Sequence, residues 1–254
     1  MTNNPINYLE IKISDKIIGY SINIENIEDD FAEYIDDKLI TICRGNRDIK
    51  LSSVKTEFIN YLEAKGQSNL LQGSVSEFFI HLFLNSQDYK QEFLYFNLEE
   101  NSMKKGFDGY YSKGDKDWIL ESKSTTQIDK THKEIISIGY NGIKKKVEGV
   151  DSQNNPWENA YNHASLGAVA TKNTLLKKLS ALSELYTEKS FGEIKDFDLM
   201  ISSTIFLEDS WNEINTDELK QEIIKYLEDK NYKSIIVICL NKKSTMHLLD
   251  YLKR

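Results

Sequence analysis

Three residues in the middle of the chain have the types and the spacing to hold a divalent cation against a phosphate. Glu121 and Lys123 follow the apolar run Trp118-Ile119-Leu120, so we expect both at the end of a buried strand. Residues two apart on a strand project to the same face, which places this carboxylate and this ammonium side by side. Asp108, within Gly106-Phe107-Asp108-Gly109, precedes them by a spacing that allows a hairpin to bring it beside Glu121.

Two carboxylates and a lysine suit the hydrolysis of a phosphodiester bond. The oxygens of Asp108 and Glu121 are hard ligands, so we expect them to bind Mg²⁺ or Mn²⁺. A bound cation polarises the phosphoryl oxygen and lowers the pKa of a bound water. Lys123 can position that water and offset charge on the phosphate. We expect Glu77, on a preceding helix, as a fourth catalytic residue, although its spacing from Ser74 fits a helix-capping pair equally well.

The tripeptide Glu-x-Lys is not specific by itself, because other copies begin at Glu10, Glu63, Glu193 and Glu228. The copies at Glu63 and Glu228 fall in expected helices, where residues two apart do not share a face. The copy at Glu193 lies in a charged loop, and no acidic residue on a neighbouring preceding strand accompanies Glu10. Context therefore favours the copy at Glu121. The alternative for this set is a surface hairpin that carries an ion pair and a turn aspartate.

The elements expected around these residues alternate between helix and strand, which predicts an α/β fold. A hairpin over 8–24 and two helices are expected within residues 1–66, a small N-terminal α+β region. Residues 67–254 are expected to form the core. Its elements are a helix from 73, strands near 92–98, 106–111 and 118–123, a helix over 129–147, a helical insertion near 157–186, a strand over 197–207, a helix over 215–229, a strand over 233–240 and a helix over 244–253. Such an order places a mixed central sheet between helices.

The composition is that of an ordinary globular protein of 254 residues. No apolar run approaches the roughly 20 residues needed to cross a bilayer, and the first residues carry no secretory leader. Two scattered cysteines, Cys43 and Cys239, are expected as buried free thiols. We therefore expect a cytoplasmic protein that does not enter the membrane.

The net charge of -8 is unfavourable for a protein that binds nucleic acid. Local lysines at 144–146, 172, 177 and 178 could supply a positive surface, or another subunit could supply it. The alternative is that these lysines form solvated helix faces. No phosphate-binding glycine loop of the GxxxxGK or GxGxxG type is present, so nucleotide hydrolysis would have to come from a partner.

Over about residues 70 to 207, the element order and the motifs resemble the core of the PD-(D/E)xK nuclease superfamily. More narrowly, Gly-Phe-Asp-Gly followed by Trp-Ile-Leu-Glu-Ser-Lys is similar to the nuclease subunits of Hachiman anti-phage defence systems. This resemblance implies a metal-dependent deoxyribonuclease that works with a helicase subunit. It assigns catalysis to Asp108, Glu121, Lys123 and Glu77, and the metal to the first two. The insertion near 157–186 departs from the minimal core.

Two other classes of function stay open. A stand-alone restriction-type endonuclease should carry its own basic cleft, and a binding module could keep the fold without catalysis. The acidic charge and the lack of an obvious recognition domain favour a defence nuclease restrained by a partner over the first class. The intact set of Asp108, Glu121 and Lys123 argues against the second. Residues 1–66 are either the docking region for a partner or an extension of the core.

Overall fold

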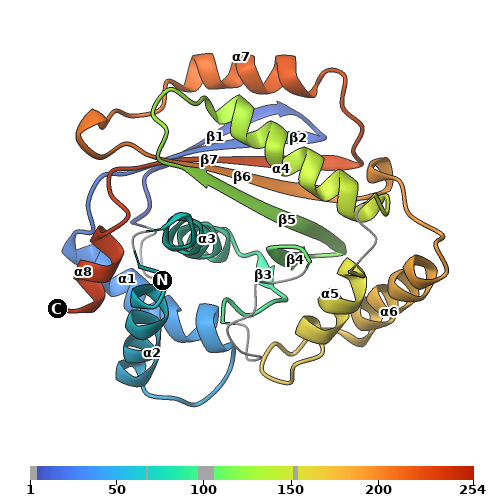
Figure 1. Cartoon of the computed structure of the whole chain (residues 1–254), viewed down its shortest axis with the longest axis horizontal. Coiled ribbons are helices and arrows are strands. Elements are labelled where there is room, and N and C mark those ends of the chain that lie inside the picture. The colour runs from blue at the N-terminus through green and yellow to red at the C-terminus, as the bar shows by residue number, and fades with distance from the viewer. Residues whose placement is uncertain (1–4, 67, 97–105, 151–153) are drawn as a thin grey trace.

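A computed structural model describes residues 5–66, 68–96, 106–150 and 154–254. Figure 1 shows a central sheet, seen nearly edge-on, between two layers of helices. The described residues form seven strands in the order β1-β2-β7-β6-β5-β4-β3. The predicted α/β fold with a mixed central sheet is confirmed.

The elements agree in most places with the sequence prediction. The strands are β1 (Tyr8–Ser14), β2 (Ile17–Ile24), β3 (Lys90–Gln91), β4 (Gly109–Lys113), β5 (Lys116–Thr125), β6 (Asp198–Phe206) and β7 (Ser234–Lys242). The α-helices are α1 (Asp29–Arg44), α2 (Leu51–Glu63), α3 (Asn69–Ser86), α4 (His132–Val147), α5 (Pro156–Ala164), α6 (Asn173–Thr187), α7 (Thr216–Leu227) and α8 (His247–Leu252). Two 3-10 turns, η1 (Ile194–Asp196) and η2 (Glu208–Ser210), flank β6. The helical insertion is thus two helices, α5 and α6.

The centre of the sheet is parallel. Strand β6 pairs in parallel with β5 and β7, and β2 pairs in parallel with β7, whereas β1, β4 and β3 join antiparallel at the two edges. All nine positions of β6 are buried, as expected for a parallel strand covered on both faces. The carboxyl ends of β2, β5, β6 and β7 therefore meet at one edge of the sheet.

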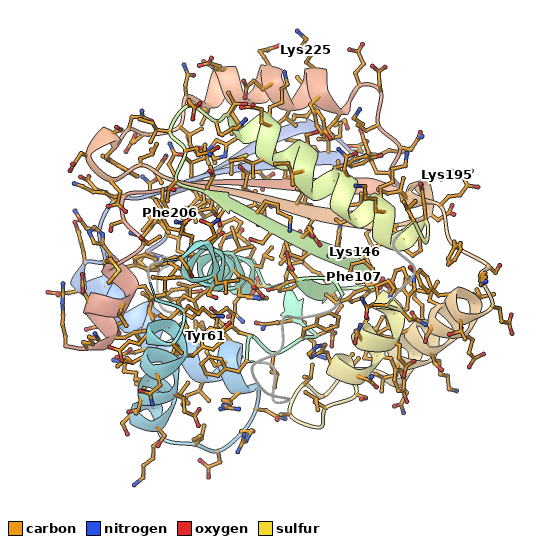
Figure 2. All side chains as sticks on the ribbon, in the orientation of Figure 1. Tyr61, Phe107, Lys146, Lys195, Phe206 and Lys225 are labelled. Atoms are coloured by element: carbon orange, nitrogen blue, oxygen red, sulfur yellow. The ribbon has the colours of Figure 1, made fainter. Side chains whose placement is uncertain are left out.

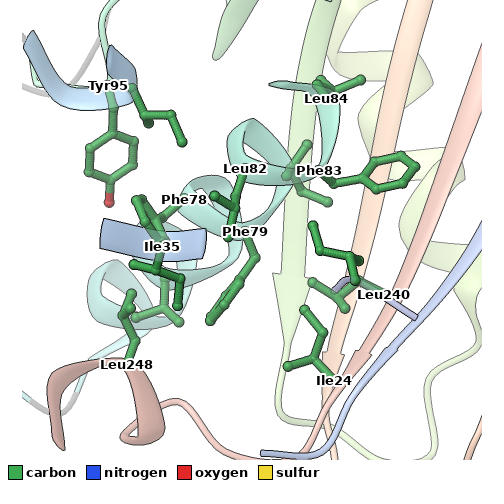
Figure 3. Close-up of a cluster of buried hydrophobic side chains, with 14 of the residues drawn as sticks. Ile24, Ile35, Phe78, Phe79, Leu82, Phe83, Leu84, Tyr95, Leu240 and Leu248 are labelled. Atoms are coloured by element: carbon green, nitrogen blue, oxygen red, sulfur yellow. The ribbon is translucent and has the colours of Figure 1, made fainter. Parts of the chain in front are cut away.

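Helix α3 fills the space between the sheet and the helices α1, α2 and α8. It is apolar around most of its circumference, because it contacts strands on one side and helices on the other. Figure 3 shows Phe83 directed toward the strands, with Leu240 and Ile24 on that side of α3 and Ile35 of α1 on the other. The opposite face of the sheet is covered by α4 and α7, with α5 and α6 beyond its β4 end (Figure 1).

The first 66 residues share the sheet and the core with the rest of the chain. Strand β2 pairs with β7 over its whole length, from Ile17 opposite Ile235 to Ile24 opposite Lys242. The ring of Phe83 in α3 lies 5.1 Å from that of Tyr20. The region expected to dock a partner therefore also contributes to the central fold.

The predicted strand near 92–98 is wrong for residues 92–96, and residues 97 and 98 lie outside the described ranges. After β3, the backbone of Glu92 donates one further bond to Tyr110 O at 2.8 Å, and the chain then leaves the sheet. The amide of Tyr95 donates instead to Ile42 O in α1, at 2.9 Å. Tyr95 and Phe96 pack against Phe58 of α2, while Phe93 packs against Tyr110 of β4 and His163 of α5. The apolar aromatic composition of this segment resembles that of a strand. The loop expected over 151–156 is described only from residue 154. Its last residue, Pro156, is the first residue of α5.

Both cysteines are buried free thiols, as predicted. Within the described ranges, no helix has the length and apolar character to span a membrane.

Lys242, at the end of β7, is a fully buried lysine on the α3 face of the sheet. Its Nζ atom lies 3.4 Å from Nδ1 of His247 and 5.6 Å from the ring centroid of Phe79. Burial lowers the pKa of this ammonium to about 7, and repulsion from Lys243 adds to the effect, while Glu208 opposes it. The unfolded chain restores the ordinary pKa of 10.5, so it binds more protons than the folded chain between about pH 7 and 10.5.

We predict that Lys242→Met increases the free energy of unfolding by roughly 1–4 kcal/mol at pH 6.5, because it removes a buried ammonium. The gain should shrink as the pH rises toward 10, where the unfolded lysine also loses its proton. Urea denaturation at pH 6.5 and 9.5 measures both values. Lys243→Met is the control, since Lys243 is partly exposed and pairs with Glu25; its effect should stay within about 0.5 kcal/mol. A gain for Lys242→Met that does not change with pH contradicts the assignment.

Candidate active site

The site forms where β4 separates from β5. Regular pairing ends at Gly109 opposite Leu120, and the amide of Asp108 still donates to Leu120 O at 3.1 Å. Beyond this point the acceptor for β5 is a side chain instead of the backbone of β4. The amide of Ser122 donates to Oδ2 of Asp108 at 2.7 Å. The predicted hairpin is present, and it fixes the carboxylate of Asp108 next to β5.

Glu121 and Lys123 project to the same face of β5, as their spacing predicts. The Nζ atom of Lys123 lies 2.8 Å from Oε1 of Glu121 and 3.9 Å from Oδ2 of Asp108. The side chain of Glu121 is only 3% exposed, whereas those of Asp108 and Lys123 are 23% and 33% exposed. Glu121 is therefore the floor of the site, and the other two groups reach toward solvent.

Helix α4 packs on the face of β5 that carries Glu121 and contributes a second lysine. The Nζ atom of Lys146 lies 2.7 Å from Oε2 of Glu121, so each oxygen of this carboxylate binds one ammonium. Figure 2 labels Lys146 close to Phe107, whose ring centroid is 6.0 Å from its Nζ. Motif spacing did not single out Lys146. Of the run at 144–146, Lys144 and Lys145 are exposed, as for a solvated face, and Lys146 turns inward.

Two glycines let α4 approach β5 closely. A Cβ atom added at Gly142 would lie 3.2 Å from Oε1 of Glu121, and one added at Gly139 would lie 2.7 Å from Cγ2 of Ile201. Gly139, Gly142 and Lys146 are three and four residues apart, which places them on one face of the helix. This face is the signal in the sequence that could have identified Lys146.

Glu77 lies within α3 and does not cap it. The helix begins at Asn69, the side chain of Ser68 caps it by accepting from the Leu70 amide, and Ser74 donates its hydroxyl to Leu70 O. The capping alternative for Glu77 is therefore wrong, and the predicted helix start at 73 is four residues too late. Oε1 of Glu77 lies 3.4 Å from Nε2 of His81. Its charge acts on both Asp108 and Lys123.

The site concentrates negative charge. The pKa of Asp108 is raised to about 7, mainly by burial and also by the carboxylates of Glu121 and Glu77, while Lys123 and Lys146 oppose the rise. Burial alone lowers the pKa of Lys123, but the three carboxylates together raise it above its usual value. Lys123 is therefore charged near neutral pH. Three carboxylates thus repel one another and share only two ammonium groups. A bound divalent cation would reduce this repulsion.

The donor set fits Mg²⁺ or Mn²⁺. Asp108 and Glu121 already share one cation, the Lys123 ammonium, so their oxygens converge on a common region. The described residues contain no group of three or more His, Cys, Asp or Glu side chains that could hold a metal ion. Two carboxylates are nevertheless a common protein contribution to Mg²⁺, because this ion keeps several waters and binds substrate phosphates. The first two residues of the predicted set are the ones that could hold it.

The other Glu-x-Lys copies lie away from this site. Glu10 is on the edge strand β1 and accepts from the Tyr20 hydroxyl, and Glu193 precedes η1. Glu63 and Glu228 lie at the ends of α2 and α7. The lysines at 172, 177 and 178 are exposed on or next to α6, and Lys178 binds Asp117 at 2.6 Å.

No protein-family model matches the chain, and a search of curated proteins finds no match. A fold alone does not determine a function, so the functional conclusion depends on the geometry of the site.

We predict opposite stability effects for alanine at two helical glycines. Gly139→Ala should lower the free energy of unfolding by about 1–3 kcal/mol, because its methyl group would push α4 from the buried Ile201. Gly73→Ala is the matched control, since Gly73 is inside α3 with nothing within 4 Å of an added Cβ. It should raise the same free energy by about 0.5–1 kcal/mol. Urea denaturation measures both, and a stabilising Gly139→Ala would mean that α4 does not pack this closely.

Proposed function

We propose that this protein is a metal-dependent nuclease that hydrolyses phosphodiester bonds of DNA. The observation that carries the proposal is the convergence of Asp108 and Glu121 on the ammonium of Lys123, at 3.9 and 2.8 Å. The two carboxylates can bind a metal cation, and the charged lysine beside them can bind a phosphate. All three lie where the β4–β5 pairing ends. The resemblance of the surrounding motifs to PD-(D/E)xK nucleases supports the same reaction.

Each residue has a part in this proposal. A bound Mg²⁺ would supply Lewis-acid activation of the phosphate and of a water. The Ser122 amide fixes the orientation of Asp108, and burial fixes Glu121, so both carboxylates are preorganised. Lys123 extends toward solvent, where it positions the attacking water and offsets charge on the phosphate. Glu77 adds negative charge from α3 and strengthens the attraction of a cation to the site.

We further propose that the enzyme is an anti-phage defence effector in the cytoplasm, held by a helicase partner. The similarity of its motifs to Hachiman nuclease subunits supports this assignment. The net charge of -8 supports it independently, since an acidic protein is repelled by DNA and needs help to engage it. A sequence-tolerant nuclease also endangers the genome of its own cell unless it is restrained.

We predict that Glu121→Ala and Lys123→Ala each abolish cleavage of plasmid DNA in Mg²⁺, because each removes a group that contacts the reacting centre. A loss of about 100-fold or more is expected from such groups. Activity of the unmodified protein should disappear in excess chelator and return with Mg²⁺ or Mn²⁺. Gel assays measure cleavage, and circular dichroism checks that each variant is folded.

Glu10→Ala and Glu228→Ala are the controls for this prediction, because both alter a Glu-x-Lys copy outside the site. They should cleave like the unmodified chain. Full activity of Glu121→Ala, or cleavage that persists in excess chelator, rejects the proposed chemistry.

We predict that a helicase encoded beside this protein binds it and slows its cleavage of intact DNA. The measurements are co-purification and the rate of plasmid loss with and without the partner. A chain that digests DNA rapidly alone, with a neighbour that neither binds nor restrains it, would instead be a stand-alone restriction-type endonuclease. The same Glu121→Ala variant should still bind the partner, since its change is confined to the floor of the site.

A further inference from the structure

Lys146 has no place in the motif, yet it is as close to the buried carboxylate as Lys123 is. Its Nζ atom is 2.7 Å from Oε2 of Glu121, and Lys123 Nζ is 2.8 Å from Oε1. Each oxygen of this carboxylate, whose side chain is 3% exposed, therefore already binds one ammonium. A divalent cation that binds Glu121 therefore competes with two ammonium groups for the same carboxylate.

The two lysines differ in where their side chains begin. Lys123 is on the rigid strand β5, two residues from Glu121, and its ammonium also faces Asp108 at 3.9 Å. Lys146 is in the last turn of α4, its side chain is 28% exposed, and its described carboxylate contact is with Glu121. A flexible four-carbon side chain at a helix end can change its partner at little cost. Lys146 is therefore the better candidate to leave.

Charge balance indicates where the released ammonium goes. When fully ionised, Asp108, Glu121 and Glu77 together with the two lysines carry one net negative charge. With a divalent cation bound, the same groups carry one net positive charge, which a single phosphodiester neutralises. An ammonium that leaves Glu121 at this moment moves away from the new cation and toward an incoming phosphate.

We propose that Lys146 is a phosphate-binding residue of the site, held on Glu121 until a divalent cation takes its place there. The inference rests on the proposed function, because it assumes that the site binds a metal and DNA. It makes Lys146 a substrate-contacting group that couples arrival of the metal to binding of the DNA backbone. A purely structural lysine would only brace Glu121.

The first test is binding of Mn²⁺ to the full chain without DNA, measured from the electron paramagnetic resonance signal of the free ion. Lys146→Met removes a competing cation, so Mn²⁺ should bind about threefold to tenfold more tightly. If Lys146 only braced Glu121, its loss would instead weaken Mn²⁺ binding or leave it unchanged. Lys145→Met removes the same charge from the same turn without touching Glu121, and its Mn²⁺ affinity should change by less than about twofold.

The second test is DNA binding by the full chain, measured by fluorescence anisotropy in Ca²⁺ over a range of salt, with the DNA checked for integrity on a gel. Loss of one phosphate contact should reduce the slope of log affinity against log salt by about one in Lys146→Met. Lys146→Arg keeps a cation and should retain the slope. Lys146→Gln is measured in parallel, so that misfolding of one variant does not decide the result.

Tighter Mn²⁺ binding together with a reduced salt slope supports the inference. Weaker or unchanged Mn²⁺ binding overturns it, as does an unchanged slope, even if the unmodified protein binds metal and cleaves DNA. Two other results reject the proposed function itself. One is that the unmodified chain does not bind Mn²⁺, and the other is that Glu121→Gln binds Mn²⁺ as tightly as the unmodified chain does. The two failures are therefore distinguishable.

Discussion

The burial of the Glu121 carboxylate is the constraint on which the site depends. An ionised carboxylate almost out of contact with water needs a charge of opposite sign on its oxygens. Here Lys123 and Lys146 provide it, one from the same strand and one from the helix above. Because Gly142 has no side chain, α4 can lie directly over this pair of contacts. The arrangement of Glu121, Lys123 and Lys146 therefore depends on the close packing of α4 on β5.

Both ends of α4 are fixed to the sheet by polar contacts. At its first residue, the buried His132 binds the Ser203 hydroxyl through Nδ1 at 2.8 Å and Oδ1 of Asn241 through Nε2 at 3.1 Å. Burial lowers the pKa of His132 to about 4, so the ring is neutral and can donate on one side and accept on the other. In the last turn, Lys146 reaches Glu121. The helix is therefore held in register along its whole length, which sets the position of Lys146.

The central residues of the site were predictable because they follow from strand geometry. A strand with Glu121 and Lys123 two apart must present both to one face, and a hairpin must bring Asp108 beside them. Lys146 was harder to predict: the spacing of Gly139, Gly142 and Lys146 marks one face of the helix, but it does not reveal that this face lies on the sheet. The packing of this face depends on the close approach of Gly139 to Ile201, two residues far apart in the chain.

The fold was predictable for a similar reason, and its main error was instructive. Strand β7 is identified by its β-branched run, β6 by its apolar residues, and the helices by their periodicity. The segment at 92–96 has the same composition as a strand, but Tyr95 and Phe96 pack against α2, Tyr95 also against α3, and Phe93 packs against β4 and α5. A short apolar run does not separate a strand from a buried irregular segment, because both can bury every side chain, as residues 92–96 do.

The distribution of charge bears on the proposed nuclease activity of an acidic protein. Residues 5–66 contain twelve acidic and eight basic side chains, a net of -4, half of the net charge of -8 carried by the whole chain. The remaining 188 residues from 67 onward share the other half, so the part that contains the proposed site is less acidic for its size. An acidic surface repels DNA and attracts basic protein surfaces such as those with which a helicase grips nucleic acid. The N-terminal region is therefore better suited to bind the proposed partner than the substrate. Because β2 is linked to β5 through β7 and β6, a partner bound there would contact the same sheet that positions Glu121.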